Sequence, residues 1–468
     1  MAMNLSRRRF LRSVGIAGAG LAAMLAGCQP VVVKETVVVK EAVEVEKEVT
    51  RIVEKPVEAK PTRGPVKLVA WSLGEIDPTI TQWKPYQDAV FAIMKDKMPE
   101  VSIENRDMGW DEVLRQNLVT GLLGGTAPDI IVGESFIQPY ARIGAFLPLD
   151  DPFKEAGIYD NLILGVQANS ITEGRLFGYS LRTGVFAFES NPQVVEKAGL
   201  DPSEWPDTWS KLLERCAAIT KAGNGEYYGY TLQGPVGFLV GGIMRYNVYS
   251  NLAGAPMCKN DCQEPFFDDP KLEKPLAFLR EINKYTPPGL TFNPDEGQVY
   301  QQLHKGVTAY QIGANWHLTW AVQHGIADII QYGPLPKPDE GGFNVSRTVG
   351  NKHVNIMSGT KYPAEAIEFV KILTMDDVTV HVYTCSDRSP STYSGLQRVL
   401  PNIKPQHKVF FEILQSAEVG CMPQWPKAAD KIWAAVNEMM TKLFTTDIPI
   451  PDLQAEAQQA AMQAIAEA

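Results

Sequence analysis

The sequence lacks the motifs that mark common catalytic and nucleotide-binding sites. No Gly-x-x-x-x-Gly-Lys loop, His-Glu-x-x-His helix or Gly-x-Ser-x-Gly turn occurs in its 468 residues. Basic residues are not in excess either, since 44 Lys and Arg stand against 54 Asp and Glu, a formal net charge of −10. Phosphate backbones are bound by basic surfaces, so nucleic acid is not an expected partner. The missing reaction motifs favour a binding function over catalysis.

Histidine is scarce and shows no metal-binding pattern. Of the six His residues, His317 and His324 stand seven apart, which suits one helix face but supplies too few ligands for a metal ion. Acidic pairs are a further catalytic pattern, yet each adjoins Pro or begins a predicted helix and is interpreted as a cap or turn. These pairs are Asp150-Asp151, Asp268-Asp269 and Asp376-Asp377. We therefore expect no catalytic residue, no metal site and no cofactor.

A permanent transmembrane helix is not expected at the N-terminus. The apolar stretch 14–26 is shorter than the roughly 20 residues such a helix needs, and it contains several Gly. The basic segment 6–12 precedes it, and Leu25-Ala26-Gly27-Cys28 ends it, which predicts an export signal over residues 1–27. The basic segment resembles a bacterial twin-arginine signal, and the last four residues resemble a lipobox. That resemblance implies that Cys28 is lipidated and anchors the mature protein to a membrane.

Residues 28–64 are predicted to form a tether between the anchor and the folded part. After Cys28 the segment consists almost wholly of Val, Glu, Lys, Ala, Thr and Pro. A heptad spacing of apolar residues favours a short coiled-coil stalk, but it covers fewer than three heptads and Pro56 would end the helix. The apolar positions are Val38, Ala42, Val45, Val49 and Ile52. A solvated, extended tether and a self-associating stalk both remain open.

Five cysteines remain beyond Cys28. Cys258 and Cys262 flank three polar residues and are the expected disulfide pair, because exported proteins retain disulfides. Cys216 falls on the apolar face of a predicted helix and is interpreted as a core thiol. The pairing state of Cys216, Cys385 and Cys421 stays open.

Strand and helix patterns alternate from Pro65 onward. Strands are predicted at 66–71, 101–103 and 129–133, with helices at 84–98 and 111–123 between them. This order predicts an α/β fold with helices on both faces of a sheet. Ligands bind beyond the carboxyl ends of strands in such sheets, which makes two segments site candidates, Trp71-Ser72 and Glu134-Ser135.

An ordered series of motifs then resembles one protein family over residues 66 to about 400. The first is Gly125-Thr126-Ala127-Pro128-Asp129, followed by Gly144-Ala145-Phe146-Leu147-Pro148-Leu149-Asp150, Gly174-Arg175-Leu176-Phe177-Gly178, Leu303-His304-Lys305-Gly306, Tyr332-Gly333-Pro334-Leu335-Pro336 and Ala364-Glu365-Ala366-Ile367-Glu368-Phe369. The series resembles the extracellular solute-binding proteins of ABC importers, in the broad sugar-binding family that includes maltose-binding proteins.

The resemblance implies a two-lobed periplasmic-binding-protein-like fold of type II, with a ligand cleft between the lobes and a hinge that closes on the ligand. Lobe one is expected at 66–182 plus 315–375, and lobe two at 183–314 plus 376–468. The implied function is to bind a mono- or oligosaccharide outside the cytoplasm and deliver it to ABC permease subunits. The protein would then be exported and lipid-anchored on the outer face of the cytoplasmic membrane.

The predicted ligand-binding residues combine strand ends, family positions and aromatic or planar polar side chains that suit sugar faces and hydroxyls. They are Trp71, Ser72, Glu134, Ser135, Arg182, Tyr246, Asn315, Trp316, Asn351, Arg388 and Trp425. Trp316 is predicted to be the main stacking platform, and Arg388 to donate hydrogen bonds to ligand oxygens. By contrast, Trp205, Trp209 and Trp433 are interpreted as core residues.

Departures from the family pattern keep two other functions open. Tyr310, Ala314, Asn351 and Arg388 replace residues usual in the family, so a ligand unlike maltose is possible. One alternative is the same fold binding a phosphorylated polyol or other non-sugar solute, which Arg182, Arg245 and Arg388 favour. The other is an exported glycan-active enzyme.

Overall fold

The computed structural model describes residues 64–468, except 135, 236–241, 260–261, 343–344, 417, 421–422, 424 and 426–427. The predicted signal, lipidated Cys28 and tether up to residue 63 lie outside the described residues, as does Cys421. In the part of the chain that is described, no helix has the length and apolar character needed to cross a membrane.

The first elements follow the predicted β-α-β-α-β order. They are β1 (Val66–Trp71), α2 (Lys84–Lys97), β2 (Val101–Arg106), α3 (Asp111–Gly124) and β3 (Ile130–Gly133). β1 pairs in parallel with both β2 and β3, as strands joined by helices do. Pro85 opens α2 at a position where its missing N–H costs no helical hydrogen bond, and Gly125 ends α3 with a left-handed φ of 64°. The predicted α/β organisation is confirmed here.

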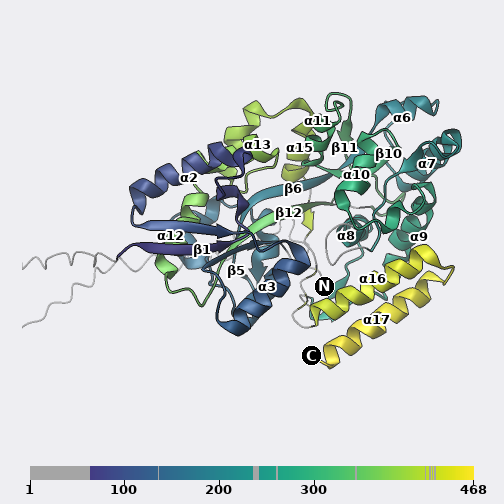
Figure 1. Cartoon of the computed structure of the whole chain (residues 1–468). Coiled ribbons are helices and arrows are strands. Elements are labelled where there is room, and N and C mark those ends of the chain that lie inside the picture. The colour runs from purple at the N-terminus through teal and green to yellow at the C-terminus, as the bar shows by residue number, and fades with distance from the viewer. Residues whose placement is uncertain are drawn as a thin grey trace, which may run out of the picture. The chain divides into compact units, whose positions relative to one another are not determined.

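Two long strands connect this first sheet region to a second. The sheet order is β2-β1-β3-β12-β6-β10-β7, with β11 on β6 and β13 on β12. The strands beyond β3 are β12 (Val345–Ile356), β6 (Tyr179–Ser190), β10 (Thr308–Ala314), β7 (Tyr228–Tyr230), β11 (Gln331–Gly333) and β13 (Glu418–Gly420). The last residues of β12 pair with β3, whereas the last residues of β6 pair with β10 and β11. Figure 1 shows β6 and β12 running between these two regions, which we call the first and second strand groups.

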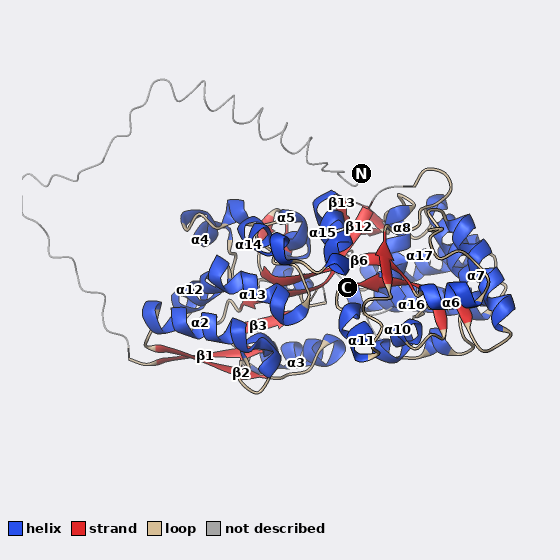
Figure 2. Ribbon diagram, turned by 90° about the horizontal axis from the view of Figure 1, so that it is seen from above, coloured by secondary structure: helices blue, strands red, loops and turns tan. Residues whose placement is uncertain are grey.

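Helices surround each strand group. The first group packs with α2, α12 (Pro363–Leu373) and α13 (Asp376–Ser386), and its apolar cluster joins Leu68 and Val90 to Phe369 and Val382. The remaining elements are α4 (Asp150–Glu155), α5 (Leu164–Gln167), α6 (Pro192–Lys197), α7 (Trp209–Gly223), α8 (Gly242–Leu252), α9 (Glu273–Ile282), α10 (Glu296–His304), α11 (His317–Gln323), α14 (Tyr393–Val399), α15 (Lys408–Ser416), α16 (Ala429–Thr445), α17 (Ile450–Ala466) and the hairpins β4 (Ile171–Thr172)–β5 (Arg175–Leu176) and β8 (Cys258–Lys259)–β9 (Glu264–Pro265). Figure 2 shows these helices on both sides of the strands.

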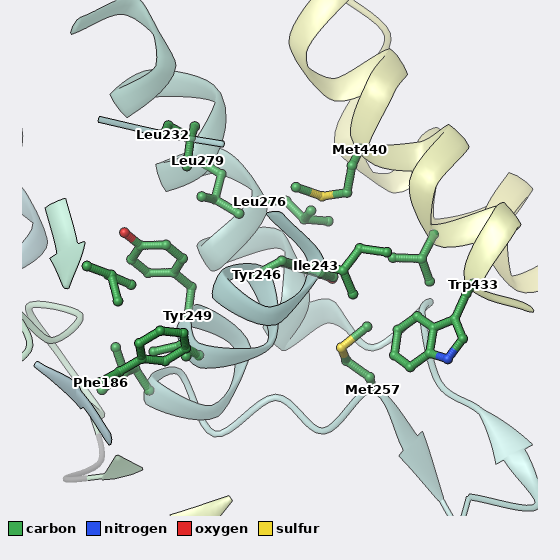
Figure 3. Packing of buried hydrophobic residues seen from close by; sticks show 14 of the residues in the cluster. Phe186, Leu232, Ile243, Tyr246, Tyr249, Met257, Leu276, Leu279, Trp433 and Met440 are labelled. Atoms are coloured by element: carbon green, nitrogen blue, oxygen red, sulfur yellow. The ribbon is translucent and has the colours of Figure 1, made fainter. Parts of the chain in front are cut away.

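Helices α7, α8, α9, α16 and α17 build the core of the second group. Figure 3 shows Tyr246 and Ile243 of α8 beside Leu276 and Leu279 of α9. Trp433 of α16 belongs to the same cluster and is 2% exposed. Trp209 and Trp433 are therefore core residues, as predicted.

The packing departs from the predicted lobe boundaries in two places. Helix α11 and strand β11 pack against α10, β10 and β6, although residues 315–375 were assigned to lobe one. Helix α13 packs against α2, although residues from 376 onward were assigned to lobe two. The reason is that a residue pattern reports which face of a helix is apolar, but not which part of a sheet that face covers.

The cysteines that the structure describes fall into two kinds. Cys258 and Cys262 form a disulfide with their Cα atoms 4.9 Å apart. Cys216 and Cys385 are buried free thiols, and burial raises the pKa of each. Cys216 is 0% exposed within the core of the second group, so its interpretation as a core thiol is confirmed.

A glycine substitution tests the contact between β7 and α7. A Cβ added to Gly229 would lie 2.4 Å from the Cα of Cys216, and that backbone has no room to move without shifting α7. We expect Gly229→Ala to lower the free energy of unfolding by about 1–3 kcal/mol, the usual cost of overpacking. Gly359→Ala is the matched control, because nothing lies within 4 Å of its added Cβ. Urea unfolding measures both, and equal losses would contradict the packing.

Candidate ligand-binding site

Strand register gathers three cations where β6 and β12 meet. Lys352 on β12 is the register partner of Arg182 on β6, and the pairing shifts on either side of Lys352. Thr183, the next residue on β6, forms an isolated β-bridge with Ser389. Because Arg388 directly precedes Ser389, it lies beside the same point of the strand. We call Arg182, Lys352 and Arg388 the cation cluster.

Glu75 is the acidic centre of this cluster. It lies in a short 3₁₀ turn (Gly74–Ile76) that follows β1, and only 2% of its surface is exposed. Its Oε1 is 3.1 Å from Nε of Arg182 and 3.3 Å from Nζ of Lys352. Burial acts to raise the pKa of Glu75, but Lys352 and Arg182 outweigh it and hold the pKa below its ordinary value. Glu75 is therefore an ionised anchor for two cations.

Each cation of the cluster also lies over an indole ring. Arg182 lies 5.2 Å from the centre of the Trp83 ring, and Lys352 lies 4.8 Å from that of Trp110. Arg388 lies 4.6 Å from the centre of the Trp316 ring. Such cation–π contacts hold a charged side chain in place while leaving part of it available to a ligand.

Burial and the positive charge of Arg182 lower the pKa values of Lys352 and Arg388. Burial, followed by the charge of Arg182, lowers the pKa of Arg388 to about 9, against the opposing effect of Glu134 and Glu75. Burial also lowers the pKa of Lys352, and the attraction of Glu75 does not fully restore it. Glu134, 9% exposed, follows β3 and brings a second carboxylate toward Arg388. Three of the predicted site residues, Arg182, Glu134 and Arg388, therefore lie in one neighbourhood.

Asn315 and Trp316 border this neighbourhood at the end of β10. The side chain of Asn315 accepts a hydrogen bond from the Val185 amide and donates one to the Thr183 carbonyl, both at 3.3 Å. Trp316 is partly buried, with its ring centre 6.1 Å from that of Phe186. Asn315 therefore fixes the end of β10 against β6. Trp316 is the next residue in the chain, so its position is set by the same contacts.

Trp71 and Ser72 are held by neighbouring elements of the first group. Trp71 is 5% exposed and packs on α3, where a Cβ at Gly121 would lie 2.9 Å from its indole. Ser72 has a left-handed φ of 57°, and its hydroxyl donates to the Gly109 carbonyl at 3.0 Å. Ligand contact by either residue stays a prediction.

Other predicted site residues lie deeper or outside the described part. Tyr246 is fully buried in the core of the second group. Trp425 is 1% exposed and packs edge-on to Phe267 and Trp433, which favours a packing role over a stacking platform. Ser135 lies outside the described residues, and Asn351 is placed on β12 without a described side chain.

Four residues of this neighbourhood escaped sequence reasoning: Glu75, Trp83, Trp110 and Lys352. Glu75 and Trp110 follow the carboxyl ends of β1 and β2, so the rule that selected Trp71 would also have found them. Lys352 adjoins the predicted Asn351. Trp83 carried no comparable signal. Within the described residues, no group of three His, Cys, Asp or Glu side chains is arranged to hold a metal ion.

A sequence model of one family matches residues 78–379, and its description is "Bacterial extracellular solute-binding protein". The match covers more than half of the chain, so the chain belongs to this family. The prediction of a solute-binding function rather than an enzymatic one is thereby confirmed at the level of the family.

Curated relatives give a shorter match. The sn-glycerol-3-phosphate-binding periplasmic protein UgpB of Escherichia coli K12 is 29% identical over 184 residues, which is 36% of this chain and 40% of the relative. UgpB of Shigella dysenteriae matches over the same length with the same identity. The match thus spans about two fifths of the length of these relatives.

Solved structures share the fold over nearly the whole described chain. An ABC transporter solute-binding protein from Thermotoga lettingae, bound with α-D-tagatose, has a TM-score of 0.70 at 20% identity and covers 86% of this chain and 100% of its own. The sugar-binding protein MalE of Xanthomonas citri has a TM-score of 0.70 at 15% identity, covering 86% and 98%. The predicted periplasmic-binding-protein fold is confirmed by this similarity, which at such identities shows the fold alone.

Proposed function

We propose that the protein is the extracytoplasmic binding component of an ABC importer and binds a carbohydrate where β6 and β12 join the two strand groups. The observation that carries the proposal is the convergence of cations, carboxylates and indoles at that junction. Sugars present hydroxyls that accept and donate hydrogen bonds, and C–H faces that pack on aromatic rings. The cation cluster, Glu134 and Trp316 supply both kinds of partner in one place.

Proteins of similar fold and sequence support a polyhydroxy ligand. The structural neighbours include one protein bound with tagatose and one with mannotriose bound, and the curated relatives bind sn-glycerol 3-phosphate. The predicted contacts of Trp71, Ser72, Ser135 and Asn351 remain part of the proposal, whereas the burial of Tyr246 and Trp425 favours packing roles for these two residues.

Motion between the two strand groups would control access to this site. β6 and β12 are the strands that connect the groups, and the register irregularity beside Lys352 lies on one of them. Arg115 of α3 donates to Asp430 of α16 at 2.5 Å, so one ion pair also joins a helix of each group. We propose that the strands bend as a hinge and that this ion pair forms when the groups close on the ligand.

The N-terminal segments fit the same role. An export signal over residues 1–27 and a lipidated Cys28 would hold the protein on the outer face of the cytoplasmic membrane. The tether would leave the binding unit free to meet the permease subunits that receive the solute. This supports a lipid-anchored substrate-binding protein.

A thermal-shift screen of the purified chain against sugars, polyols and sugar phosphates tests the proposal. A ligand at 100 times its Kd stabilises a protein by about 2.7 kcal/mol, which is a readily measured increase in Tm. We expect at least one carbohydrate to give this shift and to be recovered unchanged after incubation. Cleavage of the sugar would support an enzyme, and the absence of any shift across the screen would contradict carbohydrate binding.

Trp316→Ala tests the predicted stacking platform. Burying about 60 Å² of apolar area contributes roughly 1.5 kcal/mol, so the variant should bind the sugar at least about tenfold more weakly. Trp205→Ala is the matched control, because Trp205 contacts Phe188 and the Pro334 carbonyl instead of the cation cluster. Calorimetry gives both Kd values. An unchanged Kd for Trp316→Ala, in a folded protein, would show that Trp316 packs without touching ligand.

A further inference from the structure

The cations of the cluster are more exposed than Glu75, the carboxylate that two of them contact. The side chains of Arg182 and Lys352 are 15% and 17% exposed, whereas that of Glu75, which both contact, is 2% exposed. Arg388 is likewise more exposed than Glu75. A solute approaching the cluster therefore meets guanidinium and ammonium groups before it meets the buried acid.

The numbers of carboxylates and cations in the neighbourhood also favour an anionic ligand. Glu75 is shared by two cations and Glu134 acts on Arg388, so two carboxylates serve the three cations of the cluster. Besides burial, the positive charge of Arg182 lowers the pKa of both Lys352 and Arg388, because like charges repel across the cluster. The whole chain carries a formal net charge of −10, so this concentration of positive charge is local. A bound anion would relieve that repulsion.

The geometry also suits the oxygens of an anion. Guanidinium groups offer planar pairs of N–H donors that match carboxylate and phosphate oxygens, and an ammonium group adds three rotatable donors. Each of the three cations also lies over an indole ring, of Trp83, Trp110 or Trp316, which reduces the mobility that a ligand must otherwise restrict.

We propose that the ligand is a carbohydrate or polyol bearing a carboxylate or phosphate, and that this anionic group binds in front of Arg182, Lys352 and Arg388. This inference rests on the proposed carbohydrate-binding function and specifies the class of ligand. Carboxylates and phosphates both offer charged oxygens to the N–H donors of the cluster. The experiment below distinguishes between them.

Calorimetry on the full chain with matched pairs of probes tests the inference. The carboxylate pairs are D-galacturonate with D-galactose and trigalacturonate with galactotriose; the phosphate pairs are glucose 6-phosphate with glucose and sn-glycerol 3-phosphate with glycerol. We expect at least one acid to bind about tenfold or more tightly than its neutral partner, with affinity that falls as salt is raised. The pair that shows the preference identifies the anion.

The outcomes separate this inference from the function on which it rests. Neutral sugars that bind as tightly as their acids would overturn the anion and leave carbohydrate binding intact. Failure of every acid and every neutral sugar to bind would overturn carbohydrate binding itself.

Substitutions locate the anion. Arg388→Gln should reduce the acid-to-neutral ratio of affinities by about tenfold, and Lys352→Gln should do the same if Arg388→Gln does not fold. Arg398→Gln is the matched control, since Arg398 is 50% exposed and pairs with Asp376 and Asp377. A ratio unchanged in a folded cluster variant would show that the anion binds elsewhere and would overturn the assignment.

Discussion

Replacing Glu189 by Ala is expected to lower the free energy of unfolding by about 3–5 kcal/mol, the cost of removing one partner from a buried charged network. Glu189 lies on β6 and is 0% exposed. Its carboxylate is 2.8 Å from Nε2 of His304 and 2.9 Å from Nδ1 of His317. It also accepts hydrogen bonds from Gln311 and Tyr332 at 2.7 and 3.0 Å. The substitution would leave polar groups of four elements without their acceptor.

The same network predicts that the protein loses stability in acid. Burial acts to raise the pKa of Glu189, but His304 and His317 hold it below its ordinary value of 4.5. A depressed carboxyl pKa contributes stability that is present above the unfolded value and is lost as pH falls toward the folded one. Burial also lowers the pKa of His317, which favours its neutral form and reduces stability in the same direction.

Chemical unfolding at pH 7 and at pH 4 measures both effects. The difference in stability between the parent and Glu189→Ala should shrink at the lower pH. Glu189→Gln should cost less than Glu189→Ala at pH 7, because the amide retains an acceptor. Glu196→Ala, on an exposed position of α6, is the control and should change stability by no more than about 0.5 kcal/mol. A loss below 1 kcal/mol for Glu189→Ala would contradict the network.

Replacing Trp425 by Ala should cost a similar amount, about 3–5 kcal/mol, because it removes a large buried ring. The indole packs on Phe267 and Trp433 and is 1% exposed. Its Nε1 has no hydrogen-bond partner among the described residues. Trp425→Phe should therefore keep most of the stability, since it retains a ring and breaks no hydrogen bond to the described residues.

The Trp425 pair of variants separates packing from ligand contact. Thermal unfolding and sugar affinity are measured on both proteins. A stable Trp425→Ala variant that has lost ligand binding would contradict the packing role and restore Trp425 as a stacking platform.

The first β-α-β-α-β unit could be predicted closely from the sequence. Apolar runs and helix ends set its strands and helices to within a few residues, for example at Val66–Trp71 and Asp111–Gly124. The positions of α11 and α13 could not be predicted in this way. Each has an apolar face, but the strand group that covers this face depends on the path of β6 and β12, which no local pattern encodes.

The site was predictable only in part for the same reason. Trp316 and Arg388 were identified from residue type and family position and Arg182 from residue type, and the structure brings the three near one another. Glu75 and Lys352 were missed, because their pairing with Arg182 depends on the register between β6 and β12. Trp425 met the same criteria of residue type as Trp316, yet it is buried, since residue type does not report depth.

A crystal structure of the full chain with the sugar that gives the largest thermal shift would locate the ligand. We expect ligand density at the junction of β6 and β12, in contact with Trp316 and Arg388. Another place where a ligand could bind is a cavity of about 310 Å³ between α16 and α17, which is lined by Glu438, Lys442 and Glu456 among others. Ligand density in that cavity, with none at the junction, would contradict ligand binding at the junction of β6 and β12.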